Sequence, residues 1–119
     1  MEGKAKEEML KWLSANYPLG WKAMEMGGLR PSFQNTLIVE WLDSMGIYLE
    51  ITPDYDIFGG YNRGFYAHVI QEGVSVISVF NDNDCFNARQ EATEAAIKKA
   101  VEIYNSKYGN PQGDPETTK

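Results

Sequence analysis

Two alternating apolar segments separated by a tight turn constrain the fold more than any other feature of this sequence. Residues 65–71 and 74–80 are rich in β-branched and aromatic side chains, and Glu72-Gly73 lies between them. This pattern predicts two antiparallel strands joined by a hairpin. A third alternating segment at 47–52 precedes them and ends at Pro53. Because consecutive strands with short links pair antiparallel, we expect a three-stranded meander.

Helical periodicity flanks the expected sheet on both sides. Apolar residues recur at spacings of three and four over 4–17 and 32–45, and Gly46 stands at the second C-cap. The last helix begins after Asn87, a suitable N-cap, and its expected buried stripe is Ala88, Ala92, Ala96, Ala100 and Tyr104. The order helix, helix, three strands, helix predicts an α+β fold, a three-stranded antiparallel meander covered by helices.

The remaining segments complete the expected domain. Residues 18–33 contain proline and glycine but also many apolar side chains, so we expect an irregular stretch packed on the body, with a short turn of helix around 21–26. The chain length fits one domain, which we place at 1–108. The polar residues 109–119 are expected to form a disordered tail.

Both faces of the expected sheet are substantially apolar. On strand 47–52, Ile47, Leu49 and Ile51 share the side expected to face the helices, and Tyr48 faces away. The strands of a sheet with one solvent-exposed face normally alternate more regularly between apolar and polar residues. We therefore expect the outer face to be covered, either by segment 18–33 or the first helix, or by a second copy in a homodimer.

The charge and cysteine content exclude several classes of protein. The chain carries 17 acidic and 11 basic residues, a formal net charge of −6, which argues against direct nucleic-acid binding. The single cysteine, Cys85, rules out an intramolecular disulfide framework. The charged amino terminus and the lack of a long apolar run predict a cytoplasmic protein without membrane contact.

The sequence contains no recognisable catalytic or metal-binding motif. His68 is expected within a strand, and Cys85 lies far along the next one, so neither has an evident catalytic partner. The pairs Asp54/Asp56 and Asp82/Asp84 have the spacing of metal ligands, but Phe58 and Phe86 occupy the position of the third oxygen ligand. We expect no cofactor and no metal, and an enzyme is the disfavoured interpretation.

An acidic and aromatic edge is the main candidate site. In a meander, the long loop expected at 53–64 and the loop at 81–87 lie at the same edge of the sheet. The two loops bring four aspartates together with the aromatic residues Tyr55, Phe58, Tyr61 and Phe86, and Arg63 is the one base nearby. Aromatic anchors among acids are typical of a surface that binds a basic protein. The alternative is that the aromatic residues cap the core. The candidate partner-binding residues are Asp54, Tyr55, Asp56, Phe58, Tyr61, Asp82 and Asp84.

Two resemblances bear on function. The expected order over 34–108, helix, three-strand meander, helix, resembles double-stranded-RNA-binding domains. That family grips phosphates with a basic cluster at the start of its last helix, where this chain has Asn87-Ala88-Arg89-Gln90-Glu91. The resemblance therefore does not imply that this chain binds RNA.

The second resemblance is to small proteins of phages and mobile elements. Trp41-Leu42 before a strand, Gly59-Gly60-Tyr61 in a loop, a hairpin and a helix like 92–104 are similar to that group. The resemblance implies a non-enzymatic accessory or inhibitory role.

Taken with the acidic edge, the sequence predicts a small acidic protein-binding module whose partner is a basic protein. One alternative is an inhibitor that mimics nucleic-acid charge and blocks a basic host protein. The other is a small enzyme.

Overall fold

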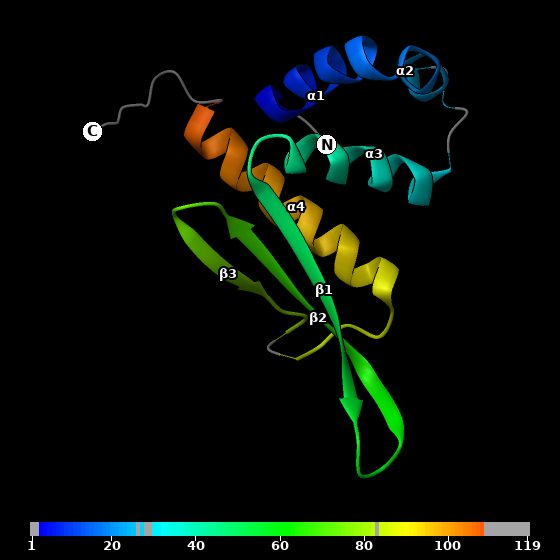
Figure 1. Cartoon of the computed structure of the whole chain (residues 1–119), viewed down its shortest axis with the longest axis vertical. Coiled ribbons are helices and arrows are strands. Elements are labelled where there is room, and N and C mark those ends of the chain that lie inside the picture. The colour runs from blue at the N-terminus through cyan, green and yellow to red at the C-terminus, as the bar shows by residue number, and fades with distance from the viewer. Residues whose placement is uncertain (1–2, 26, 28–29, 83, 109–119) are drawn as a thin grey trace.

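The computed structural model describes residues 3–25, 27, 30–82 and 84–108. Its elements follow the order α1 (Gly3–Asn16), α2 (Pro18–Glu25), α3 (Pro31–Asp43), β1 (Ile47–Asp56), β2 (Tyr61–Gln71), β3 (Ser75–Val79) and α4 (Arg89–Tyr108). The α+β class and the antiparallel meander β1-β2-β3 are confirmed (Figure 1). The expected tail at 109–119 lies outside the described residues.

The sheet keeps a regular register except at one point. Leu49 pairs with Val69 and Val69 with Ile77, so one row of side chains crosses all three strands. The Glu72-Gly73 turn forms as expected: the Val74 N–H donates to the Gln71 carbonyl at 2.9 Å, and Gly73 has φ +73°. This turn sets the β2–β3 register.

The prediction of a long loop at 53–64 is wrong. β1 continues through Pro53 to Asp56, and β2 begins at Tyr61, so only residues 57–60 remain as a turn. Proline is tolerated because β1 is an edge strand, where a missing N–H breaks no ladder bond on the open side. The segment is a hairpin that extends the sheet.

The irregular segment expected at 18–33 is largely helical. Pro18, one of the residues that favoured an irregular stretch, follows the end of α1 and occupies the first position of α2, where its fixed φ suits a helix start. Gly20 lies inside α2 and faces α3, where a Cβ would make an ordinary contact of 3.6 Å with Leu37 Cδ1. The turn of helix expected around Trp21 is thus part of a longer element.

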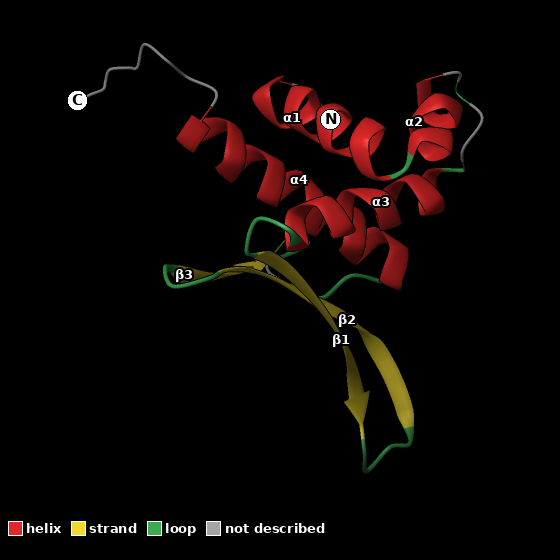
Figure 2. Ribbon diagram, turned by 45° about the horizontal axis from the view of Figure 1, so that its top comes forward, coloured by secondary structure: helices red, strands yellow, loops and turns green. Residues whose placement is uncertain are grey.

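The helices form layers on one side of the sheet (Figure 2). α4 packs on β1 and β2, and α1 and α3 pack on α4. The largest core side chain is Trp41, which is 2% exposed and meets the Tyr104 ring edge-on at 5.2 Å between centroids. Asn105 of α4 also accepts the Ala5 N–H at 2.8 Å, which ties the start of α1 to α4.

The alanine stripe of α4 is confirmed except at its first position. Ala92, Ala96 and Ala100 are fully buried. Ala88 is exposed, because the helix begins one residue later, at Arg89, and not directly after Asn87. The small side chains let α4 lie close to the sheet.

The outer face of the sheet is uncovered, which corrects the expectation that α1 or segment 18–33 would shield it. Among the described residues, every helix lies on the other side (Figure 2). Val76 is 63% exposed and Phe80 is 55% exposed. The helix-facing side is as expected, with Ile47 buried and Leu49 and Ile51 packed against the core.

The fully buried Ala96 leads to a stability prediction. We expect Ala96→Leu to lower the free energy of unfolding by about 1–3 kcal/mol, because added methylenes cannot fit between α4 and the sheet without moving one of them. Urea denaturation measures the change. Lys98→Leu, at an exposed position of the same helix, is the control and should leave stability nearly unchanged. Equal stability of both variants would contradict this packing.

Candidate functional site

A two-stranded arm, defined here as residues 53–64, projects beyond the rest of the protein (Figure 1). It is the distal part of the β1–β2 hairpin, and β3 pairs with β2 only from Ala67 onward. Phe58 at its tip is completely exposed and Ile57 is 81% exposed. Tyr55 and Tyr61 behind them are about half exposed. The arm therefore presents apolar side chains away from the core.

The turn at the tip is built by Asp56. Its Oδ1 accepts the N–H groups of Phe58 and Gly59, both at 3.0 Å. Its carbonyl accepts the Gly60 N–H at 2.7 Å, and Gly60 adopts φ +73°. These three bonds satisfy the N–H groups of Phe58, Gly59 and Gly60 and hold the turn that carries Ile57 and Phe58.

The arm meets the body at a β-bulge. The β1–β2 register shifts between Pro53 and Tyr55, and Gly64 on the opposite strand has φ +151°. Phe65 and Phe86 exchange two backbone hydrogen bonds of 2.8 Å, which attach the segment after β3 to the base of the arm. A Cβ on Gly64 would collide with the Phe86 carbonyl oxygen and lie 2.6 Å from Cys85 Sγ. Only glycine fits this junction.

A polar cluster stabilises the base of the arm. Asp54, whose side chain is only 16% exposed, accepts hydrogen bonds from Arg63 Nη2 at 3.2 Å and from the Tyr66 hydroxyl at 3.1 Å. The bond to Asp54 raises the pKa of the Tyr66 phenol above its ordinary value, and Asp54 likewise raises the pKa of Arg63. Asp54, a candidate partner-binding residue, is thus paired within the arm and its base.

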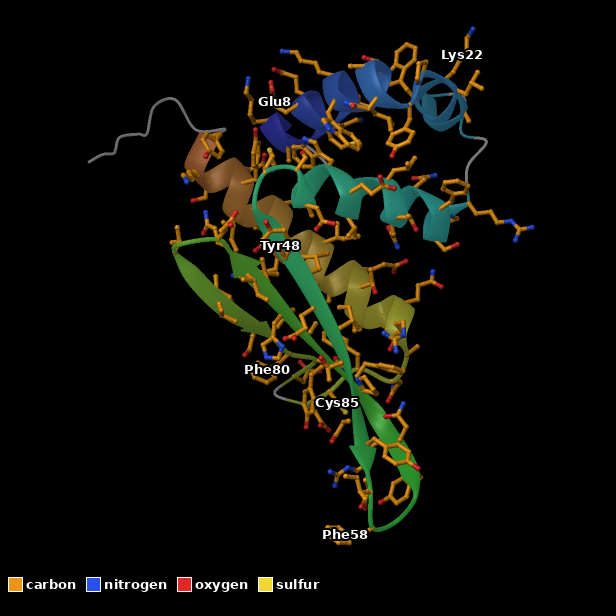
Figure 3. All side chains as sticks on the ribbon, in the orientation of Figure 1. Glu8, Lys22, Tyr48, Phe58, Phe80 and Cys85 are labelled. Carbon is orange, nitrogen blue, oxygen red and sulfur yellow. The ribbon has the colours of Figure 1, made fainter. Side chains whose placement is uncertain are left out.

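The structure brings the seven candidate residues to one end of the sheet but separates them into two groups. The arm carries Asp54, Tyr55, Asp56, Phe58 and Tyr61. Asp82 and Asp84 lie in the segment attached at the base of the arm, and Figure 3 shows Phe58 well beyond Cys85. The expected convergence holds only for the base, because the strands carry the aromatic tip outward.

Two details differ from the sequence interpretation. Phe86, expected among the edge aromatics, is 7% exposed and belongs to the core. Ile57 was not selected, although it precedes Phe58 and Gly59-Gly60, where an apolar pair beside glycines could have indicated an exposed tip.

His68 and Cys85 have separate neighbours. His68 lies on the outer face, with Nδ1 3.4 Å from Glu50 Oε1 but without a hydrogen bond to it. Cys85 Sγ contacts the Arg63 carbonyl oxygen at 3.6 Å. Within the described part of the chain, no group of three or more potential ligands is arranged to hold a metal ion.

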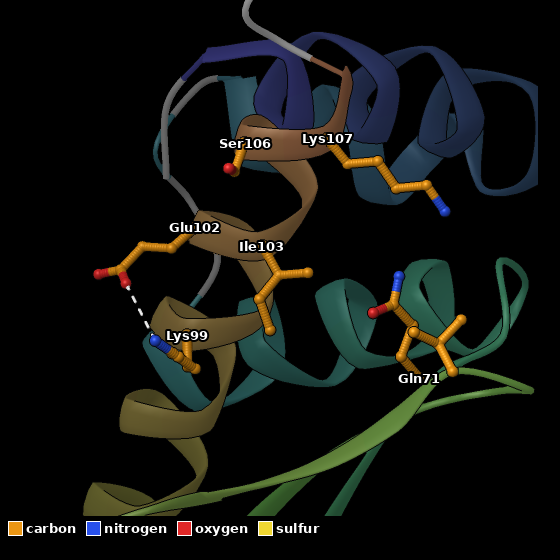
Figure 4. A pocket seen from close by; sticks show the side chains of 7 residues that line it. Gln71, Lys99, Glu102, Ile103, Ser106 and Lys107 are labelled. Atoms are coloured by element: carbon orange, nitrogen blue, oxygen red, sulfur yellow. Dashed lines mark ion pairs between the residues drawn. The ribbon is translucent and has the colours of Figure 1, made fainter. Parts of the chain in front are cut away.

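The surface hollows are shallow grooves. One of about 510 Å³ lies between α4 and the β2–β3 turn, with Lys99 and Glu102 forming an ion pair of 3.9 Å at its rim (Figure 4). Another of about 480 Å³ lies between α3 and the start of α4 and is lined by Val39, Arg89 and Thr93, among others. Neither lining includes any of the seven candidate residues.

Comparison of this chain with protein-family models, curated protein sequences and solved structures gives no match. Of the helices in the described residues, none has the length and hydropathy required to cross a membrane.

Gly64 and Gly60 form a matched pair for testing the junction. Both have positive φ, but a Cβ on Gly60 would meet nothing within 4 Å. We expect Gly60→Ala to cost about 1–2 kcal/mol from backbone strain alone. Gly64→Ala should cost about 2–4 kcal/mol, because the collision with Cys85 and Phe86 adds to the strain. Equal losses in urea denaturation would show that the junction is not close-packed.

Proposed function

We propose that this protein is a non-enzymatic protein-binding module that uses the tip of its arm as the contact element. The observation that carries the proposal is the full exposure of Phe58, beside exposed Ile57, at the end of a hairpin whose turn is held by three hydrogen bonds. An aromatic side chain buries about 150–250 Å² when it enters a pocket. Left exposed, Phe58 contributes no burial to folding, whereas a partner that covers it gains that area.

The construction of the arm supports this role. Asp56 fixes the turn, and the Asp54–Arg63–Tyr66 cluster fixes the base. Binding by a preformed element loses less conformational entropy than binding by a flexible loop. The arm therefore suits an apolar pocket on a folded partner.

The charge of the chain favours a basic partner. Asp82 and Asp84 are exposed at the base of the arm, and the whole chain carries −6. Such charges chiefly steer association. A partner with an apolar pocket beside a basic surface would match both features.

Direct nucleic-acid binding has little support. Arg89 is the one base at the start of α4, and it is engaged internally: Nη1 donates to the Ile51 carbonyl at 3.4 Å, and the guanidinium lies 4.9 Å from the Phe65 ring centre. Mimicry of nucleic-acid charge is weakly supported as well, because Asp54 and Asp56 both accept internal hydrogen bonds.

Replacement of the tip side chain tests the proposal. We expect Phe58→Ser to weaken binding to a captured partner by at least about tenfold, as for an aromatic hot spot, without lowering thermal stability. Affinity capture from native lysate, followed by titration with the purified partner, measures the effect. Leu19→Ser, at an 84% exposed position of α2, is the matched control. Unchanged binding by Phe58→Ser would contradict the proposal.

Asp82→Asn tests the electrostatic part. Asp82 has φ +50°, a conformation that asparagine tolerates, so the substitution removes charge with little strain. We expect slower association with a basic partner, most clearly at low salt, and an unchanged dissociation rate. Stopped-flow or biosensor kinetics at two salt concentrations provide the measurement. A change confined to the dissociation rate would argue against steering.

A further inference from the structure

The outer face of the sheet is an apolar surface of its own, distinct from the arm tip. Strand pairing places Tyr48, Ile70 and Val76 in one row across all three strands. The next row is Glu50, His68 and Ser78, and beyond it lie Thr52 and Tyr66. Figure 3 shows Phe80 at the end of β3, close to this row. The face is thus two apolar bands separated by one polar row.

The exposed area of this face is large enough for a weak specific interface. Tyr48 and Tyr66 are each 38% exposed, Phe80 is 55% exposed and Val76 is 63% exposed. With about 200 Å² per aromatic side chain, these four residues offer roughly 400 Å² of mainly apolar surface. Adding the polar row, two copies would bury about 1,200 Å² in total, at the lower end of specific interfaces.

The charge on the face is small enough for two copies to meet. Asp54 is neutralised by Arg63, and Glu72 accepts a hydrogen bond from the Tyr48 hydroxyl at 3.3 Å. Glu72 keeps its charge, because a tyrosine hydroxyl is neutral, and Glu50 is the second such acid, with His68 beside it. The face thus carries two uncompensated carboxylates per copy, and salt at physiological ionic strength screens the repulsion between two copies.

We propose that the protein forms a symmetric homodimer by packing the outer faces of two sheets together. A two-fold axis places the apolar bands of the two copies against each other and allows Glu50 of one copy to approach polar groups of the other. The arm curves away from the helix layer, toward the side of this face (Figure 2). Sheets that cross near a right angle leave room for both arms. The proposal does not depend on the function of the arm tip.

Sedimentation velocity of the full chain between about 1 and 500 µM tests the dimer. Interfaces at the lower end of the size range are typical of weak, transient association, so we expect a dissociation constant on the order of 10–100 µM. We therefore expect the mass to rise from 13.5 kDa toward twice that value over this range. A mass that stays at 13.5 kDa at the highest concentration overturns the proposal.

Lysine substitutions locate the interface. Val76→Lys and Phe80→Lys should each weaken dimerisation at least about tenfold, because each buries a charge in the contact. Leu19→Lys on α2 and Ile57→Lys at the arm tip are the controls and should dimerise like the parent. If one of these two outer-face variants fails to fold, the other variant still tests the interface.

Dimerisation that persists in a folded outer-face variant overturns the assignment. If only the Ile57→Lys variant loses the dimer, self-association belongs to the arm, and the assignment to the outer face is overturned as well. Partner binding by the arm is measured separately with Phe58→Ser, so the two proposals can fail independently.

Discussion

The close approach of Gly64 to Cys85 and Phe86 is the contact on which most of this architecture depends. Two backbone hydrogen bonds between Phe65 and Phe86 attach the segment after β3 to β2, and the bulge at Gly64 makes room for it. Phe86 is thereby buried in the core, and α4 begins three residues later at Arg89. The guanidinium of Arg89 then lies over Phe65. One junction thus sets both where the arm leaves the body and where the helix that covers the sheet starts.

The body of the fold could be predicted because burial leaves a periodic signal. The meander, the helix-facing row of β1 and the buried alanines of α4 all follow from alternation or from spacings of three and four. The arm could not be predicted in this way, because no helix faces it and its residues need not alternate. Pro53 and the glycines suggested a loop, whereas the proline lies on an edge strand and Gly64 forms a bulge. Pro18 was ambiguous for a similar reason, since proline both ends and begins helices.

The candidate site was predictable in composition but not in geometry. Sequence spacing indicated an exposed group of aromatics and acids, and Tyr55, Phe58 and Tyr61 are exposed. It could not indicate that Asp54 pairs with Arg63 and Tyr66, or that Asp56 accepts the N–H groups of the turn. The pairings of Asp54 depend on the register across β1 and β2, which the bulge shifts. The bonds to Asp56 are local, but they belong to the tight turn at 57–60, where the sequence suggested a long loop. Asp84 Oδ1 also accepts the Cys85 N–H at 2.8 Å, so three of the four candidate acids accept internal hydrogen bonds.

The arm separates structural residues from contact residues. A two-stranded hairpin without further support is marginally stable in water, so its stability must come from its base and its turn. The base contributes the Gly64 junction and the Asp54 cluster, and the turn contributes the hydrogen bonds to Asp56. Ile57 and Phe58 take part in neither through their side chains, and both are exposed. Because these two side chains do not stabilise the turn or the base, selection can adapt them to the surface of a partner without disturbing the fold that presents them.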